Sequence, residues 1–191
     1  MNKSFYILTI LALLLLSGLV LLPGASAQEA GQGPQAPSDV ILYVKPGGTG
    51  DCTSWANACE LQTALTSASA GGEIWAAAGT YTPGTSRDDT FQLVSGAALY
   101  GGFTGTETSR EQRNWETNIT TMSGDIGVAG NNSDNSYHVV TGSGVDATAI
   151  LDGFTVSGGN ADGVYPALGG GMSNYNSSPT LSNVTLSLIH I

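Results

Sequence analysis

The chain has 191 residues, of which 15 are acidic and 5 are lysine or arginine, so its formal net charge is −10. A surface this acidic argues against nucleic acid or an anionic membrane as a partner, because both repel negative charge. The length is sufficient for one domain with a sizeable core.

Residues 1–27 have the pattern of a secretory signal peptide. Lys3 precedes a long apolar run, and Ala25-Ser26-Ala27 supplies the small residues that signal peptidase accepts. We expect cleavage between Ala27 and Gln28, a secreted or cell-surface protein, and no membrane span in the mature chain. An uncleaved N-terminal anchor is the alternative, because the apolar run is nearly long enough to cross a bilayer. Residues 28–39 are polar, with glycine and proline, and predict a disordered leader.

Cys52 and Cys59 are the only cysteines in the chain and lie seven positions apart. In an exported protein such a pair predicts one local disulfide. A zinc site would need further ligands nearby, and the surrounding sequence offers none.

One helix is predicted, over residues 57–70, because apolar residues recur there at helical spacing. Asn57 is the expected N-cap, with Glu60 at the third helical position of a capping box. Gly71-Gly72 is expected to end the helix. Residues 40–71 are therefore interpreted as an N-terminal cap that contains the helix and the disulfide.

Residues 72–187 alternate between short strand-like runs and clusters of turn residues. A shift of 30 residues aligns ILDGFTVS (150–157) with TLSNVTLS (180–187), and Asp152-Gly153 of the first copy is interpreted as a corner between two short strands. This pattern predicts a coil that stacks on itself, with four or five coils of about 20–30 residues.

The succession of GGEIWAAAGTY (71–81), LYGGFTG (99–105), LDGFTVSGGNA (151–161) and SPTLSNVTLS (178–187) resembles exported bacterial right-handed parallel β-helix proteins, which are pectin-lyase-like in fold. The last stretch also resembles the repeats of polymorphic outer-membrane proteins. The resemblance implies an all-β chain, folded as a right-handed parallel β-helix, or solenoid, with an N-terminal capping α-helix.

We expect the N-terminal fragment of a secreted or cell-surface β-helix protein that is structural or that binds glycans in adhesion. The alternative is a polysaccharide lyase or glycoside hydrolase whose catalytic part is missing. The expected partner is a cell-surface or extracellular polysaccharide, in a groove beside one sheet face. Trp75, Trp115 or Tyr137 would form its stacking platform.

Arg110 and Arg113 lie in a charged stretch beside Glu107, Glu111 and Glu116. Mutual charge satisfaction within this loop is the favoured interpretation. In the alternative, one of the two arginines is the base of a polysaccharide lyase. A bound Ca²⁺ would then make the α-proton of the sugar more acidic, so that the arginine can remove it.

The stretch SGDIGVAGNNSDNS (123–136) places hard oxygen ligands in one loop, from Asp125, Asn131, Asn132 and Asp134. Their spacing matches no calcium-binding repeat, so a polar loop is the favoured interpretation and a Ca²⁺ site is the alternative. No other cofactor is predicted.

The final residues, 188–191, read LIHI, where the 30-residue register places turn glycines and an asparagine in the preceding copy. Bulky apolar residues fit such a corner poorly. We therefore expect these residues to be a non-native or truncated end, with further C-terminal coils missing.

Overall fold

The computed structural model describes residues 40–163 and 168–187, which belong to one compact unit. The expected signal peptide of residues 1–27, its cleavage site at Ala27-Gln28, the leader of residues 28–39 and the non-native end of residues 188–191 lie outside the described residues. Within the described residues, no helix has the length and apolar character needed to cross a membrane.

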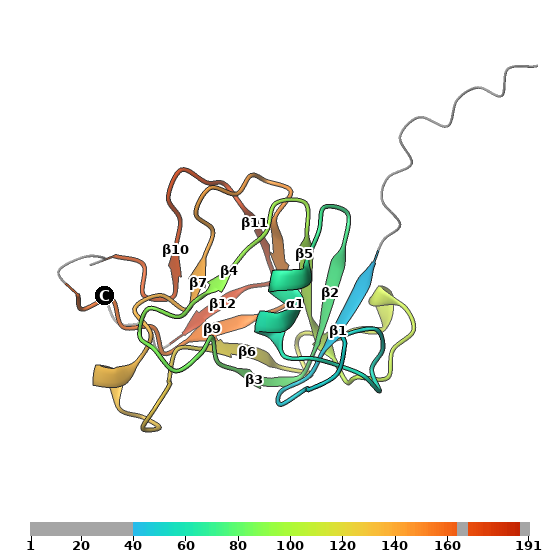
Figure 1. The fold of residues 1–191 in the computed structure, drawn as a ribbon, viewed down its shortest axis with the longest axis horizontal. Helices are drawn as coiled ribbons and strands as arrows, with labels where there is room; N and C mark the ends of the chain where they lie inside the picture. Colours follow the sequence, from blue (N-terminus) through green and yellow to red (C-terminus); the bar gives the residue numbers. More distant parts are fainter. Residues whose placement is uncertain (1–39, 164–167, 188–191) are drawn as a thin grey trace, which may run out of the picture. The chain divides into compact units, whose positions relative to one another are not determined.

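Most regular structure is β-strand, arranged in three parallel sheets that we call sheets A, B and C (Figure 1). Sheet A contains, in spatial order, β1 (Ile41–Val44), β2 (Glu73–Ala77), β5 (Ala98–Phe103), β8 (Ile150–Asp152) and β11 (Thr180–Ser182). Sheet B contains β3 (Gly79–Tyr81), β6 (Thr120–Ser123), β9 (Thr155–Ser157) and β12 (Thr185–Ser187). Sheet C contains β4 (Phe91–Gln92), β7 (Val140–Thr141) and β10 (Met172–Ser173).

The chain visits the three sheets in a fixed order. From β2 onward, successive strands belong to sheets A, B and C in turn, and each strand pairs in parallel with the strand three places later. We call one passage through the three sheets a circuit. In Figure 1 the colours of sheet A therefore run from blue at β1 to red at β11, because each strand of the sheet comes from a later circuit.

The predicted register of 30 residues is confirmed between the third and fourth circuits, where Leu151 pairs with Leu181 and Val156 pairs with Leu186. The expected length of 20–30 residues is wrong for the second circuit. Ala98 pairs with Ile150, 52 positions later, because this circuit carries two long loops. These are loop 104–119, which follows β5, and loop 124–139, which follows β6.

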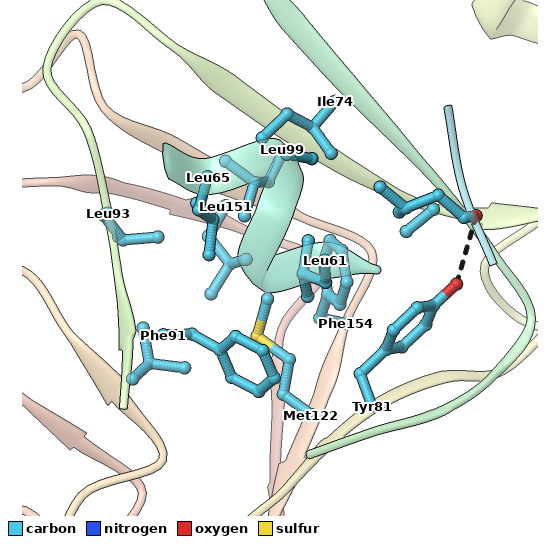
Figure 2. Packing of buried hydrophobic residues seen from close by; sticks show 14 of the residues in the cluster. Leu61, Leu65, Ile74, Tyr81, Phe91, Leu93, Leu99, Met122, Leu151 and Phe154 are labelled. Carbon is cyan, nitrogen blue, oxygen red and sulfur yellow. Dashed lines mark hydrogen bonds between the residues drawn. The ribbon is translucent and has the colours of Figure 1, made fainter. Parts of the chain in front are cut away.

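The core is built from the inward-facing residues of all three sheets. Side chains alternate between the two faces of a strand, so every second residue of these strands enters the core. Figure 2 shows members from sheet A (Ile74, Leu99, Leu151), sheet B (Tyr81, Met122), sheet C (Phe91) and the helix (Leu61, Leu65), all at most 6% exposed. At the outer strands β11 and β12, the corresponding Leu181 and Leu186 are 46% and 53% exposed.

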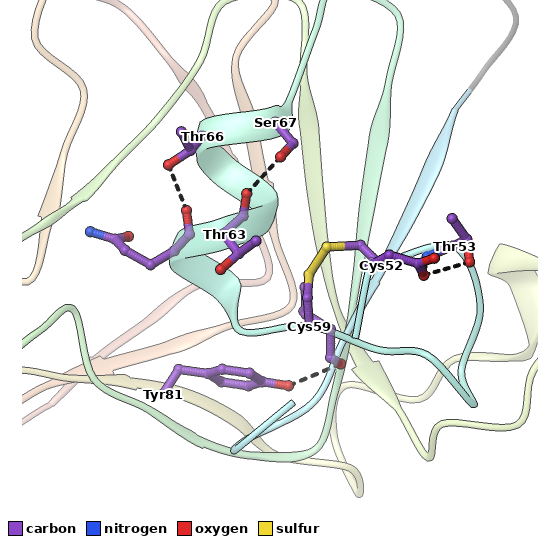
Figure 3. The surroundings of a disulfide bond; sticks show 10 residues. Cys52, Thr53, Cys59, Thr63, Thr66, Ser67 and Tyr81 are labelled. Atoms are coloured by element: carbon purple, nitrogen blue, oxygen red, sulfur yellow. Dashed lines mark hydrogen bonds between the residues drawn. A yellow bond between two sulfur atoms is a disulfide. The ribbon is translucent and has the colours of Figure 1, made fainter. Parts of the chain in front are cut away.

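The predicted disulfide joins Cys52 to Cys59 (Figure 3). The backbone of both cysteines also pairs with β1, since Tyr43 donates its N–H to the Cys52 carbonyl at 2.9 Å and accepts from the Cys59 N–H at 3.1 Å. The bridge therefore closes a loop that is already attached to the first strand.

The helix α1 (Leu61–Ser67) is shorter than the predicted 57–70, and the predicted capping box is wrong. Glu60, not Asn57, is the N-cap, and it makes no side-chain capping hydrogen bond. The reason is that Cys59 is held in the ladder of β1, which prevents the helix from starting earlier. At the other end Ala68 is already extended, so Gly71-Gly72 lies beyond the helix. The helix packs against β1, β2 and β4.

The corner at Asp152-Gly153 is present between β8 and β9, as predicted. Gly153 has a φ of 81°, in the left-handed region that favours glycine. One circuit later the same corner is made by Asn183, with a φ of 50°, and asparagine tolerates this region better than most residues. The corner brings sheet A and sheet B together, and the candidate site lies beside it.

Candidate functional site

The outer face of sheet A is covered by a second, smaller hydrophobic cluster. Its buried members are Trp75, Tyr100 and Phe103, and Tyr43 and Trp55 pack against them. The Trp75 and Phe103 rings stack with centroids 4.8 Å apart. Trp75 is only 3% exposed, so the expectation that it forms a stacking platform is wrong. Loops cover this face of sheet A, and the local sequence around Trp75 does not indicate this covering.

Loop 104–119 is shaped at its start by Glu107, which is 9% exposed. Its carboxylate accepts the backbone N–H groups of Thr104 at 2.6 Å, Gly105 at 3.0 Å and Thr106 at 2.9 Å. Burial raises the pKa of Glu107, but the hydrogen bonds from Thr104 and Thr106 outweigh it and hold the pKa at about 2. The ionised carboxylate therefore fixes the turn that directs this loop back over sheet A.

Arg110 lies in the 3₁₀ helix η1 (Arg110–Gln112) and reaches back to β2. Its Nη1 donates to Glu73 Oε1 at 2.7 Å and to the Tyr100 hydroxyl at 3.1 Å. Burial acts to lower the pKa of Arg110, whereas the Glu73 carboxylate raises it, and the net result is a raised pKa. The guanidinium therefore stays charged, which does not suit a general base.

Arg113 is more deeply placed than Arg110, with 9% of its side chain exposed. Its Nη2 donates to Asp152 Oδ2 at 2.6 Å, and its Nη1 donates to the Gly101 carbonyl at 3.2 Å. The guanidinium also lies over the Tyr100 ring at 5.1 Å and the Trp115 ring at 4.7 Å. The clamp, by which we mean Arg113 with Asp152, joins loop 104–119 to the corner at Gly153.

The expected partners of the two arginines were the nearby Glu107, Glu111 and Glu116, and this expectation is wrong. The ion pairs run to strands 37 and 39 positions away in sequence. Glu107 is used by its own loop, as described above. Arginine partners at this separation depend on the circuits lying side by side, so only the three-dimensional fold reveals them.

A pocket of about 320 Å³ opens beside the clamp, between loop 104–119 and the corners of the third and fourth circuits. Among the residues that line it are Trp115, Glu116, Ile119, Thr155, Asn183 and Thr185. Trp115 is 36% exposed and Ile119 is 48% exposed. Trp115 also borders a neighbouring depression with Arg110, Glu111 and Arg113. An aromatic ring at the rim of a mostly polar pocket is suited to stacking on a sugar.

The floor of this pocket continues into an ordered set of hydroxyl groups on the outer face of sheet B. Strand register aligns Thr80 with Thr121, Thr121 with Thr155, and Thr155 with Thr185. Two positions along, the register aligns a second column, made of Ser123, Ser157 and Ser187. We call these two columns the hydroxyl array.

The threonine column points outward because the intervening residues point inward, whereas Ser123 of the serine column is 7% exposed and its hydroxyl accepts the Asp125 N–H at 3.1 Å. Tyr81, Met122 and Val156 are at most 1% exposed. In the described part of the chain, the four threonine hydroxyls hydrogen-bond no other protein group, unlike that of the adjacent Thr120, which accepts the Gly102 N–H at 2.9 Å. The threonine column therefore has free donors and acceptors.

Tyr137, the third expected platform residue, is half-buried under the guanidinium of Arg87, which lies 4.1 Å from its ring centroid. Arg87 is itself paired with Asp162. Of the three aromatic residues considered, Trp115 is therefore the one whose ring borders a pocket and retains substantial exposure.

The carboxylates of the expected calcium loop turn toward the backbone of that loop. The Asp125 carboxylate accepts the Gly130 N–H at 2.9 Å, and the Asp134 carboxylate accepts the Val128 N–H at 2.9 Å. Within the described ranges, no group of three or more His, Cys, Asp or Glu side chains is arranged to hold a metal ion.

Of the two asparagines of the same loop, Asn131 uses its side chain within the loop. The Asn131 side chain accepts the Ser133 N–H at 3.2 Å and the Ser133 hydroxyl at 2.8 Å. Asn132 begins the 3₁₀ helix η2 (Asn132–Asp134), and its backbone carbonyl accepts from Asn160 Nδ2 at 2.7 Å. The side-chain oxygens of Asp125, Asn131 and Asp134 thus accept hydrogen bonds from within the loop, as in a polar turn.

Comparisons with protein-family models, curated proteins and solved structures found no match to this chain. The hydroxyl array is the feature that the sequence interpretation missed. The signal was available, because the tripeptides Thr121–Ser123, Thr155–Ser157 and Thr185–Ser187 share the pattern Thr-x-Ser.

Proposed function

We propose that this chain is an exported or cell-surface module, folded as a right-handed parallel β-helix, that binds glycan in an adhesive or structural role. The fixed order of sheets A, B and C supports the solenoid, since each circuit stacks on the preceding one. Right-handedness follows from the strong preference for right-handed connections between parallel strands. In this arrangement α1 covers the end of the solenoid at β1, and export depends on residues 1–27.

The observation that carries glycan binding is the pocket at Trp115. Glycan sites combine an aromatic face with a few polar groups that fix orientation. Trp115 supplies the face, while Asn183, Thr155 and Thr185 supply neutral polar groups. The clamp beneath Trp115 holds the ring in place through the Arg113 guanidinium. The site is thus preorganised, which reduces the entropy lost when a ligand binds.

The same pocket supports binding over turnover. Glycoside hydrolysis needs two carboxyl groups that flank the scissile bond. Among the described residues that line the pocket, Glu116 is the only one with a carboxyl group. Arg110 and Arg113 are each held in an ion pair, so neither is free to accept the proton that a lyase must remove.

The test compares the mature chain with its Trp115→Ala variant by affinity gel electrophoresis against a panel of neutral and acidic polysaccharides. We expect retardation by at least one polysaccharide and its loss in Trp115→Ala. Tyr175→Ala is the matched control, because Tyr175 is 72% exposed and lies outside the pocket. Absence of retardation by every polysaccharide would contradict the proposed function, as would equal effects of the two variants.

A further inference from the structure

The hydroxyl array has a geometry that selects among glycans. Neighbouring strands of a sheet lie about 4.8 Å apart, so the threonine column presents one hydroxyl at that interval. This repeat is comparable to the length of one sugar unit in an extended polysaccharide. The column crosses four strands in register, from Thr80 to Thr185, without interruption.

The charge of this surface also selects between neutral and acidic glycans. The array consists of neutral side chains, and Glu116 adds a negative charge at the rim of the pocket. The nearest cation, Arg113, is paired with Asp152 at 2.6 Å. With a net charge of −10 for the chain, a polyanion would meet repulsion and, among the described residues that line this pocket, no cation. A neutral polysaccharide meets no such electrostatic repulsion.

The array and Trp115 meet at the same pocket, since Thr155 and Thr185 line it together with the indole ring. Threonine and sugar hydroxyls each donate and accept hydrogen bonds, so the two sets are complementary. A ligand that stacks one ring on Trp115 can therefore continue across sheet B along the threonine column.

We propose that the hydroxyl array binds an extended, neutral polysaccharide that crosses the strands of sheet B and stacks one sugar on Trp115. This inference rests on the proposed function and narrows it in two ways. It excludes acidic polysaccharides as the ligand, and it assigns the contact to Thr121, Thr155 and Thr185. The aromatic ring then fixes one point of the ligand, and the threonines fix its direction.

The experiment uses the variant Thr121→Val/Thr155→Val/Thr185→Val, which removes three hydroxyls and keeps the β-branched shape that strands favour. Thr63→Val is the matched control, because Thr63 is exposed on α1, which packs against β1, β2 and β4 and is not part of the hydroxyl array. The probes are xylan, mannan, laminarin and hydroxyethylcellulose, with polygalacturonate as the acidic comparison. Circular dichroism and gel filtration check that each variant is folded and monodisperse, and Thr155→Ser, which keeps the hydroxyl, provides a second variant.

We expect at least one neutral polysaccharide to bind, with affinity reduced about tenfold or more in the triple variant and unchanged in Thr63→Val. Thr155→Ser should keep most of the affinity, and Thr155→Val alone should lose part of it. Neutral binding that the valine variants leave unchanged would overturn the inference and leave the proposed function standing. Binding of polygalacturonate and of no neutral probe would also overturn the inference and leave the proposed function standing. Binding of no probe would contradict both.

Discussion

Arg113 is the residue on which the geometry of the site depends most. It connects loop 104–119 to the corner at Asp152, and its guanidinium supports the Trp115 ring. Both members of the clamp keep only about a tenth of their side-chain surface exposed, at 9% and 13%. At this depth the two charges stay paired mainly because burying either of them without its partner would be energetically costly.

Removing the carboxylate of the clamp should therefore destabilise the fold. We expect Asp152→Ala to lower the free energy of unfolding by roughly 3 kcal/mol, because it leaves Arg113 charged, buried and without its partner. Glu116→Ala, which removes an exposed carboxylate that forms no ion pair among the described residues, should change it by less than about 0.5 kcal/mol. Urea unfolding followed by tryptophan fluorescence measures both. Equal effects of the two variants would show that the clamp contributes no stability.

The turn at Glu107 predicts a dependence on pH. Its pKa of about 2 lies below the ordinary value of 4.5, so the ionised form stabilises the folded state. This contribution is complete above about pH 4.5 and is lost as the pH falls toward 2. Glu107→Gln should therefore be less stable than the wild type at pH 7, and the difference should shrink as the pH approaches 2. Denaturant unfolding across this range is the measurement, and a constant difference would contradict the assignment.

At the scale of elements, the corner between β8 and β9 is set by Gly153. An added Cβ there would lie 2.8 Å from Arg113 Nη1, in addition to the strain of a φ of 81°. Gly144 has a similar φ of 75°, but an added Cβ would meet no atom within 4 Å. The two glycines therefore separate backbone strain from steric contact.

We expect Gly144→Ala to lower the free energy of unfolding by about 1 kcal/mol, which corresponds to the backbone strain alone. Gly153→Ala should cost at least about 1 kcal/mol more, because the clamp must also shift. The free energies of unfolding of the two variants give the comparison. Equal losses would show that the clamp does not press on this corner.

The disulfide is the second element-scale device. Cys52 and Cys59 close a short loop against β1, so the double variant Cys52→Ser/Cys59→Ser should lose about 2.5 kcal/mol by loop-closure entropy. Cys52 has a φ of 66°, a conformation that glycine adopts without strain. The free energy of unfolding of Cys52→Gly/Cys59→Ser should therefore be higher than that of the double serine variant by up to about 1 kcal/mol. Thermal or urea unfolding measures both, and two free thiols in the exported wild-type chain would contradict the bridge.

Strands and their register were predictable because their signals are local and repeated. The 30-residue shift that aligns Leu151 with Leu181 is the pairing found in sheet A. The start of α1 was not predictable, since the ladder with β1 that holds Cys59 involves residues distant in sequence. The same reason hid the burial of Trp75 and the partner of Arg113, because both depend on loops that return over other circuits.

At the scale of the whole described unit, the outer faces of two sheets have different roles. On sheet A, loops bury an aromatic cluster around Trp75 and Phe103, so this face stabilises the fold. On sheet B, the hydroxyl array carries no such covering cluster and opens into the pocket at Trp115. Loop 104–119 of the second circuit contributes to both features, since Arg110 contacts Tyr100 on sheet A and Trp115 lines the pocket beside sheet B. In the proposed function, ligand binding therefore belongs to sheet B.

The most direct test is a methyl- and indole-resolved NMR titration of the mature chain with short oligosaccharides prepared from xylan, mannan and cellulose. We expect saturable shifts in the methyl signals of Thr121, Thr155 and Thr185 and in the Trp115 indole signal, with none in Thr63. Shifts centred on any other surface, or no shift with any of these oligosaccharides, would contradict this expectation.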